Sequence, residues 1–336
     1  MRRRFLSTNQ RPVRYMTVEP LENGVYLSFG GQGLYYSIDD SEWVSLPNDT
    51  NTPSINIGQT IKIKGLNIKT DTRNNHFIIN GRCKLSGTIM SIIYGDKPYE
   101  EKIPLNIDFT GAFCNCTSIV SVAPDFLPAT TLADGCYQDM FYGCTSLTVA
   151  PELPATTLAD GCYKFMFYGC TSLTTAPELP ATTLASNCYR YMFQNCTSLT
   201  TAPELPVTTL ANYCYYGMFN GCTSLTTAPE LPATTLTNSC YYNMFSGCTS
   251  LTTAPELPAT TLASNCYSLM FLNCSKLNYI KMLATDVSAY NCLHSWVDNI
   301  SSTGTFVKNP AMTSLPTATS SNYYAGIPSG WSVQNA

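Results

Sequence analysis

A segment of 26 residues that recurs along the middle of the sequence constrains the fold of this chain more than any other feature. The unit follows the pattern C-Y-x-x-M-F-x-[GN]-C-T-S-L-T-x-A-P-E-L-P-A-T-T-L-x-x-x, with small departures. Because one such unit cannot bury its own apolar face, copies must stack on one another to form a continuous core. Two rows of cysteines mark the period: Cys136, Cys162, Cys188, Cys214, Cys240, Cys266 and Cys292, and Cys144, Cys170, Cys196, Cys222, Cys248 and Cys274.

The spacing of apolar residues within each unit predicts a short helix followed by an extended segment. Residues 136, 137, 140, 141 and 144 fall within an arc of roughly 140° at about 100° per residue, which predicts an amphipathic helix over 136–144. Pro151 and Pro154 bar a helix farther on, so residues 147–153 are expected to form a short strand. We therefore expect an α+β repeat, a solenoid of 26-residue units over residues 113–283.

The regions on either side of the repeats differ in pattern. Alternating apolar and polar residues across 16–70, broken by turn signals such as Asn23-Gly24, predict a small all-β sandwich-like domain that precedes the solenoid. Residues 71–112 are expected to form an N-terminal β cap, with strands at 76–79 and 85–90. Residues 284–336 are expected to form a C-terminal cap and tail, with a helix at 286–297 and a strand at 304–307. Residues 1–15 are expected to be a basic tail.

The residues that usually carry catalysis or metal binding are scarce or unsuitably spaced. Two histidines in the whole chain leave little room for a Ser-His-Asp triad or a histidine metal site. The 16 cysteines mostly alternate at spacings of 8 and 18, not at the short spacing of zinc sites, so buried free thiols are favoured over disulfides and over a metal. We expect no enzyme, no cofactor and no metal.

A row of carboxylates recurs with the same period. One glutamate per unit follows the first proline, and the row is expected to be solvated, with a bound divalent cation as the alternative. Five equivalent sites do not form the unique pair that a catalytic carboxylate mechanism needs. The row consists of Glu152, Glu178, Glu204, Glu230 and Glu256.

The distribution of charge excludes some partners. Residues 111–275 contain two basic and nine acidic residues, which argues against binding to a nucleic-acid backbone. No run of about 18 apolar residues exists, so we expect no membrane insertion. The arginine-rich start is not followed by an apolar stretch, so export by a signal peptide is not expected either.

The string M-F-x-G-C-T-S-L-T, followed by a proline-bounded strand, resembles the BspA-like leucine-rich repeat family of surface proteins, common in Bacteroidota and their phages. The resemblance covers about residues 111–283 and implies a leucine-rich-repeat-type solenoid. The usual unit of that family has about 23 residues with A-F-x-G-C-x-S-L, whereas here methionine replaces alanine and the unit is longer. The resemblance implies a non-enzymatic module for adhesion and recognition.

The order of a basic tail, a small β domain, repeats and an Ile-Pro-Ser-Gly-Trp ending looks like that of phage structural proteins from the same host group. We therefore expect a virion protein, a tail or head fibre that contacts the host surface. The alternative is a bacterial cell-surface adhesin. The corresponding locations are the virion and the bacterial cell surface.

The outward positions of the expected helix differ between copies and carry aromatic and charged side chains that are typical of binding surfaces. Simple drift of exposed positions is the alternative explanation. We predict that this face contacts a glycan or a protein on the host surface, because aromatic side chains offer a large contact area at low entropic cost. The predicted residues are Gln138, Asp139, Tyr142, Lys164, Phe165, Tyr168, Arg190, Tyr191, Gln194, Tyr216 and Tyr242.

The basic start of the chain is predicted to dock on other virion proteins. Fibres commonly stand on symmetric mounts, so a homo-trimer is the first expectation and a monomer the second. The predicted docking residues are Arg2, Arg3, Arg4, Arg11 and Arg14.

Overall fold

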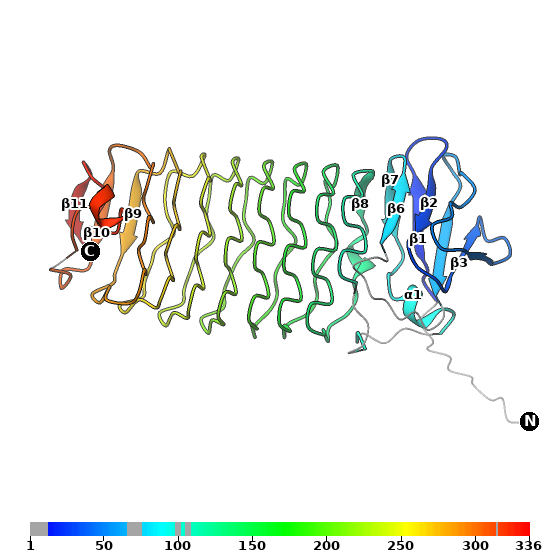
Figure 1. Cartoon of the computed structure of the whole chain (residues 1–336), viewed down its shortest axis with the longest axis horizontal. Coiled ribbons are helices and arrows are strands. Elements are labelled where there is room, and N and C mark those ends of the chain that lie inside the picture. Colours follow the sequence, from blue (N-terminus) through cyan, green and yellow to red (C-terminus); the bar gives the residue numbers. More distant parts are fainter. Residues whose placement is uncertain (1–12, 66–75, 98–101, 105–108, 314) are drawn as a thin grey trace, which may run out of the picture.

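The molecule is elongated, with a β domain at one end of a long row of stacked coils (Figure 1). The computed structural model describes residues 13–65, 76–97, 102–104, 109–313 and 315–336. Within these residues the only helices are the short α1 (Ser91–Tyr94) and two 3₁₀ turns, η1 (Pro124–Phe126) and η2 (Ser320–Asn322). None of the described helices is long and apolar enough to cross a membrane.

Two sheets form the N-terminal region. The larger sheet has the strand order β4-β3-β5-β1-β7-β8, and β2 pairs with β6 in the smaller one. All of these pairs are antiparallel except β7 with β8. The bounds are β1 (Met16–Pro20), β2 (Tyr26–Phe29), β3 (Leu34–Ile38), β4 (Val44–Leu46), β5 (Ile61–Gly65), β6 (Phe77–Asn80), β7 (Cys83–Ser86) and β8 (Ile119–Val122).

Strand pairing joins this region to the repeats. The expected strand at 76–79 is present as β6, and β6 and β7 pair with β2 and β1 across the expected boundary at residue 70. The strand expected over 85–90 is wrong beyond Ser86. Gly87 there has a φ of 74°, and an added Cβ would lie 1.7 Å from the Tyr15 carbonyl oxygen, so the chain turns. Parallel pairing of β7 with β8 then leads into the first coil.

The helix predicted over 136–144 is wrong, and so is the helical part of the expected α+β class. Residues alternate strictly in their hydrogen bonds. The amide of Met140 donates to the carbonyl three residues back, at Tyr137 (3.3 Å), whereas the amide of Phe141 donates to Met166 of the next unit (2.9 Å). Every fourth residue, at 135, 139 and 143, has a left-handed backbone with φ of 65°, 55° and 70°. We call residues 135–144 and their equivalents in the other coils the turn segments.

Four-residue turns explain why the pattern resembled a helix. A left-handed residue at every fourth position buries residues 136, 137, 140, 141 and 144, and these same positions also share one face of a helix. The same alternation continues through residues 289–299, so the helix expected at 286–297 is also wrong. We call residues 109–299 the repeat stack. Isolated parallel bridges such as Thr175 to Thr201 and Thr157 to Thr183 join its coils elsewhere.

Identical side chains stack along the core. Phenylalanine rings from Phe113 to Phe271 repeat at 5.5–5.9 Å, and tyrosine rings from Tyr137 to Tyr267 repeat at 5.9–6.1 Å. The phenylalanine column continues into the β domain through Phe77, at 5.1 Å from Phe113, and it ends against the buried Trp296. The column therefore links both ends of the stack.

All 16 cysteines are free, and all but the half-buried Cys114 are buried. The thiols of the second row lie 3.0–3.2 Å from a phenylalanine carbonyl of the preceding unit, as Cys196 does from Phe167. Burial raises the pKa of these thiols, to about 12 for Cys196. The side chains therefore stay protonated and donate to those carbonyls.

A parallel sheet closes the far end of the stack. Strand β10 (Thr305–Lys308) lies between β9 (Tyr279–Met282) and β11 (Ser332–Asn335). The strand expected at 304–307 is therefore confirmed. Trp296 donates its indole N–H to the Gly326 carbonyl at 2.9 Å, which fixes the C-terminal segment against the last coil.

Candidate partner-binding surface

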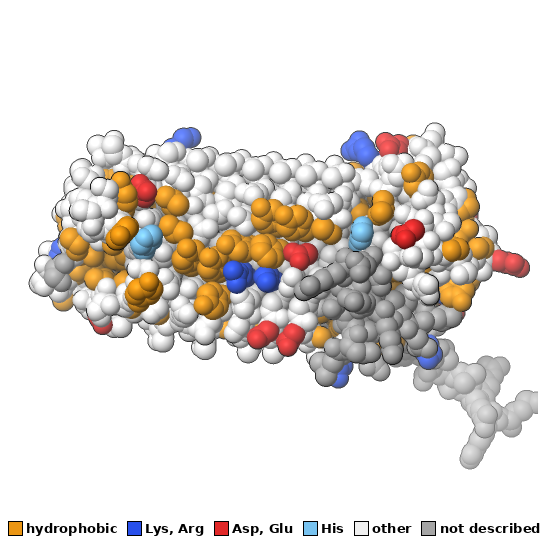
Figure 2. Space-filling model, viewed as in Figure 1, with side chains coloured by type: hydrophobic (Ala, Val, Ile, Leu, Met, Phe, Trp, Pro, Cys, Tyr) orange, Lys and Arg blue, Asp and Glu red, His pale blue; other side chains and the backbone are white. Residues whose placement is uncertain are grey.

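The predicted binding residues lie on the turn segments and are half-buried rather than fully exposed. Figure 2 shows a band of hydrophobic side chains along this side of the molecule, with basic side chains within it. We call this surface the aromatic ridge. It consists of Tyr142, Lys164, Phe165, Tyr168, Arg190, Tyr191, Tyr213, Tyr216 and Tyr242.

Rings of the aromatic ridge stack on one another in pairs. Tyr142 lies 4.5 Å from Tyr168 with the ring planes 1° apart, and Tyr216 lies 4.5 Å from Tyr242. Phe165 and Tyr191 stack at 5.0 Å. Edge contacts of Phe165 with Tyr168 and of Tyr191 with Tyr216 join the pairs into one row. Stacking therefore covers one face of each ring in a pair.

Two basic side chains lie among these rings. The Arg190 guanidinium is 4.6 Å from the centre of the Tyr216 ring, 5.5 Å from Tyr191 and 5.9 Å from Tyr213. Its Nη1 donates to the Asn187 side chain at 3.2 Å, whereas its buried Nε has no hydrogen-bond partner. The Lys164 ammonium lies 5.5 Å from the Phe165 ring. No salt bridge of either residue is present within the described part of the chain.

The backbone under the ridge is unfavourable for the side chains it carries. Phe165, Tyr191 and Tyr213 have φ of 55°, 56° and 58°. A left-handed conformation costs roughly 1–2 kcal/mol for a residue with a Cβ. At the equivalents of Gly143 the sequence has only glycine or asparagine, yet at these three positions it has aromatic residues. Such strain tends to be found at functional sites.

Neighbouring residues hold the ridge in place. The amide side chain of Gln138 donates to Asp139 at 3.0 Å, and that of Gln194 donates to Asn220 at 2.8 Å. Burial raises the pKa of Asp139, although Gln138 and the charge of Lys164 oppose the shift. An added Cβ on Gly217 would lie 2.3 Å from the Tyr191 ring. Glycine at 217 therefore leaves room for that ring.

A hollow of about 480 Å³ lies at the N-terminal end of the ridge. Hydrogen bonding aligns Cys114 and Gly111 with Tyr142 and Asp139 of the following coil, so no ring takes the next place in the row. Among the described residues only Tyr168 stacks on Tyr142. One face of the Tyr142 ring therefore adjoins the hollow. The lining is His76, Thr110, Gly111, Cys114, Asn115, Asp139 and Tyr142.

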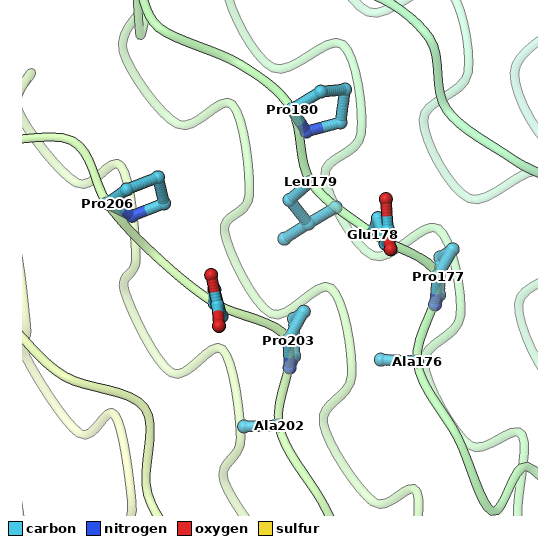
Figure 3. A pocket seen from close by; sticks show the side chains of 9 residues that line it. Ala176, Pro177, Glu178, Leu179, Pro180, Ala202, Pro203 and Pro206 are labelled. Atoms are coloured by element: carbon cyan, nitrogen blue, oxygen red, sulfur yellow. The ribbon is translucent and has the colours of Figure 1, made fainter.

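A second surface follows the glutamate row. Figure 3 shows a hollow between two neighbouring coils, where Glu178 lies beside Pro177 and Leu179. The hollow measures about 430 Å³ and also includes Glu204. All five glutamates are exposed, and Glu256 pairs with Lys281 at 2.9 Å. In the part of the chain that is described, no three His, Cys, Asp or Glu residues are grouped so as to hold a metal.

Of the predicted docking arginines, Arg14 lies within the described residues. Arg14 forms an ion pair with Asp125, which lowers the pKa of that carboxyl, so its charge is engaged within the chain. Arg2, Arg3, Arg4 and Arg11 lie outside the described residues. Docking through this segment stays a prediction.

Sequence reasoning did not single out Tyr213 and Asn187. Both occupy the first left-handed position of their turn segments, which the expected helix placed before its first residue. A signal for this position was present in the sequence. Two other copies have glycine before the first cysteine, where the string Ala-Asn-Tyr-Cys at 211–214 has Tyr213, and glycine there indicates a left-handed backbone.

The family model described as the BspA type leucine rich repeat region matches residues 106–218 and 204–301 in six copies. These matches cover more than half of the chain. No curated protein and no solved structure matches the chain. The turn segments, the threonine bridges and the aromatic ridge all lie within the matched residues, and the chain belongs to the BspA-type leucine-rich repeat family.

Proposed function

We propose that the chain is a non-enzymatic recognition protein whose aromatic ridge contacts a partner on a cell surface. Repeats of this family are typically protein-interaction modules and suggest a surface or adhesin-type protein. The observation that carries the proposal is the presence of aromatic rings at strained left-handed positions of a half-exposed surface. The glutamate row is the weaker candidate because it is the same in each copy and encodes no choice of partner.

As part of this proposal, the protein is a component of a phage virion, where it forms a tail or head fibre. The motive is the arrangement in which a β domain occupies one end and the repeat stack extends away from it (Figure 1). The second candidate is an adhesin of the bacterial cell itself, which the family resemblance favours. Mass spectrometry of purified virions and of bacterial surface fractions separates the two. Detection only in the surface fraction would establish the adhesin and reject the fibre.

Cell binding by a triple variant tests the recognition surface. The variant combines Phe165→Ser, Tyr168→Ser and Tyr191→Ser, and the control combines Glu178→Gln with Glu204→Gln. With a panel of gut Bacteroidota strains, the triple variant should lose about 1–2 kcal/mol of binding free energy or more, because two or three interface hot spots are removed. The control should bind as the parent does. The opposite pattern would assign recognition to the glutamate row.

A further inference from the structure

The placement of charge on the repeat stack is the starting point. Residues 111–275 contain nine acidic residues but only two basic ones, Lys164 and Arg190. These two are 26 residues apart, so they occupy the same position in adjacent coils, and both lie on the aromatic ridge. Within residues 111–275 the positive charge therefore lies at one place, in the middle of the aromatic ridge.

The Arg190 guanidinium is fixed in place but forms no salt bridge within the described residues. Three tyrosine rings and the Asn187 side chain fix its guanidinium, and the buried Nε has no hydrogen-bond partner. A guanidinium presents a planar fork of donors that matches a carboxylate in a bidentate manner. A ligand carboxylate beside Arg190 and Lys164 would meet two cations that form no salt bridge within the described residues, although the charge of Asp139 also acts on Lys164.

The orientation of the rings favours the same ligand charge. The edge of an aromatic ring carries partial positive charge and its face partial negative charge. In the ridge, each stacked pair covers one face of both of its rings, which removes part of the negative face area from contact with a ligand. Ring edges, tyrosine hydroxyls and two cations together attract an anionic group.

The surroundings limit how much negative charge a ligand can carry. Acidic residues outnumber basic ones nine to two over residues 111–275, which would repel a dense polyanion such as a nucleic acid. A ligand polymer whose negative charges are far apart would instead be attracted by Lys164 and Arg190. The hollow beside Tyr142 offers a ring face on which a sugar can stack. That face lies two coils from Arg190, or about 10 Å at the usual strand spacing.

We propose that the aromatic ridge binds a glycan with isolated carboxylates, one carboxylate lying between Lys164 and Arg190 and a nearby sugar ring lying against Tyr142. This inference rests on the proposed recognition function and names its ligand class. Arg190 and Lys164 supply the charge recognition, and the hollow supplies a contact that is independent of charge.

The test is binding of the full chain to an array that pairs carboxylated glycans with the same glycans after methyl esterification. The acids should bind and their esters should bind at least about tenfold more weakly, as expected for loss of one charge-assisted hydrogen bond. Arg190→Gln should remove most of that preference, and so should Lys164→Gln. Lys281→Gln, which removes the same charge at the strand side, should leave the preference intact.

A second variant separates the two contacts. Tyr142→Ser should weaken acids and esters by the same factor, because it removes the ring face and no charge. Equal binding of acids and esters, an absence of glycan binding, or tighter binding of polyglutamate than of any carboxylated glycan would overturn the inference. If any of these results accompanies loss of cell binding by the triple serine variant, the recognition function stands and only the ligand class is wrong. If the triple variant binds cells normally, the proposed function itself fails.

Discussion

Residues with a left-handed backbone recur along the surface of the turn segments. Three rows of them run along the repeat stack, and the row equivalent to Gly143 has only glycine or asparagine. The row equivalent to Asp139 instead contains Phe165, Tyr191 and Leu269, with φ of 55–58°. For the two aromatic residues, ring stacking worth about 0.5–1.5 kcal/mol per pair offsets the backbone cost. Leu269 has no aromatic ring, so no ring stacking offsets its backbone cost.

Substitution at these positions should separate strain from function. Leu269→Asn should raise the free energy of unfolding by about 1 kcal/mol, because asparagine accepts a left-handed backbone better than leucine. Tyr191→Asn should change stability little, since relief of strain and loss of stacking oppose each other, but it should weaken partner binding. Denaturant unfolding and cell binding measure the two effects. A large loss of stability in Tyr191→Asn would mean that this ring serves packing and not recognition.

Crowding distinguishes two glycines in the same row. Gly143 and Gly169 both have a φ of 70°, but an added Cβ would lie 2.3 Å from the Asn115 side chain at Gly143 and touch nothing closer than 3.9 Å at Gly169. Gly169→Ala should therefore cost about 1–2 kcal/mol from the backbone alone, and Gly143→Ala should cost more. Chemical unfolding of both variants checks the order. Equal losses would show that Asn115 moves aside freely.

Among the elements, the turn segments were the least predictable. The sequence correctly predicted their buried positions, the strands at 76–79 and 304–307, and the period of stacking. It could not separate a helix from four-residue turns, because both bury the same positions. The available signal was glycine or asparagine at every equivalent of Gly143 and at several equivalents of Gly135, which disfavours a helix.

Buried thiols make the stability of these elements depend on pH. Folding raises the pKa of Cys196 from 9.0 to about 12, because burial disfavours the thiolate. The stabilisation is therefore fully present below pH 9 and is lost as the pH rises from 9 toward 12, since only the unfolded thiol ionises in that range. Each such thiol contributes about 1.4 kcal/mol per pH unit. Unfolding midpoints at neutral pH and near pH 10 should differ strongly.

Thiol counting provides the matching control. Without reductant, a thiol reagent should find most of the 16 cysteines in denaturant, and in the native protein it should reach Cys114 first because that residue alone is half-buried. Few reactive thiols in denaturant would show that disulfides staple the core. A stability independent of pH up to about 11 would show that the thiols are solvated.

Across the whole molecule, one column of rings joins the β domain to the last coil through Phe77 and Trp296. The sequence predicted a stack from its period alone, because stacking is the only way for such units to bury their apolar residues. It predicted most of the ridge residues, but for the wrong reason, since they lie on turns and not on a helix. The stacking of the rings on one another depends on the rise between coils, which no residue pattern records.

Docking of the N-terminal region on other virion proteins stays a prediction. A shortened chain that lacks residues 1–14 should keep its melting temperature, because among the described contacts that it loses the ion pair between Arg14 and Asp125 is exposed, and exposed ion pairs contribute at most about 1 kcal/mol. It should nevertheless fail to join the virion if the basic start docks there. Sedimentation of the full chain tests the expected homo-trimer. Normal incorporation of the shortened chain would reject the docking role.

The claim that the aromatic ridge is the recognition surface is tested most directly by hydroxyl-radical footprinting of the full chain, free and bound to the cells it recognises. Oxidation of Tyr142, Phe165, Tyr168 and Tyr191 should fall on binding, whereas the exposed Tyr290, at 72% of its surface, should react equally in both states. Protection of Pro177 and Pro180 beside Glu178, with unchanged reactivity of the ridge rings, would contradict the claim.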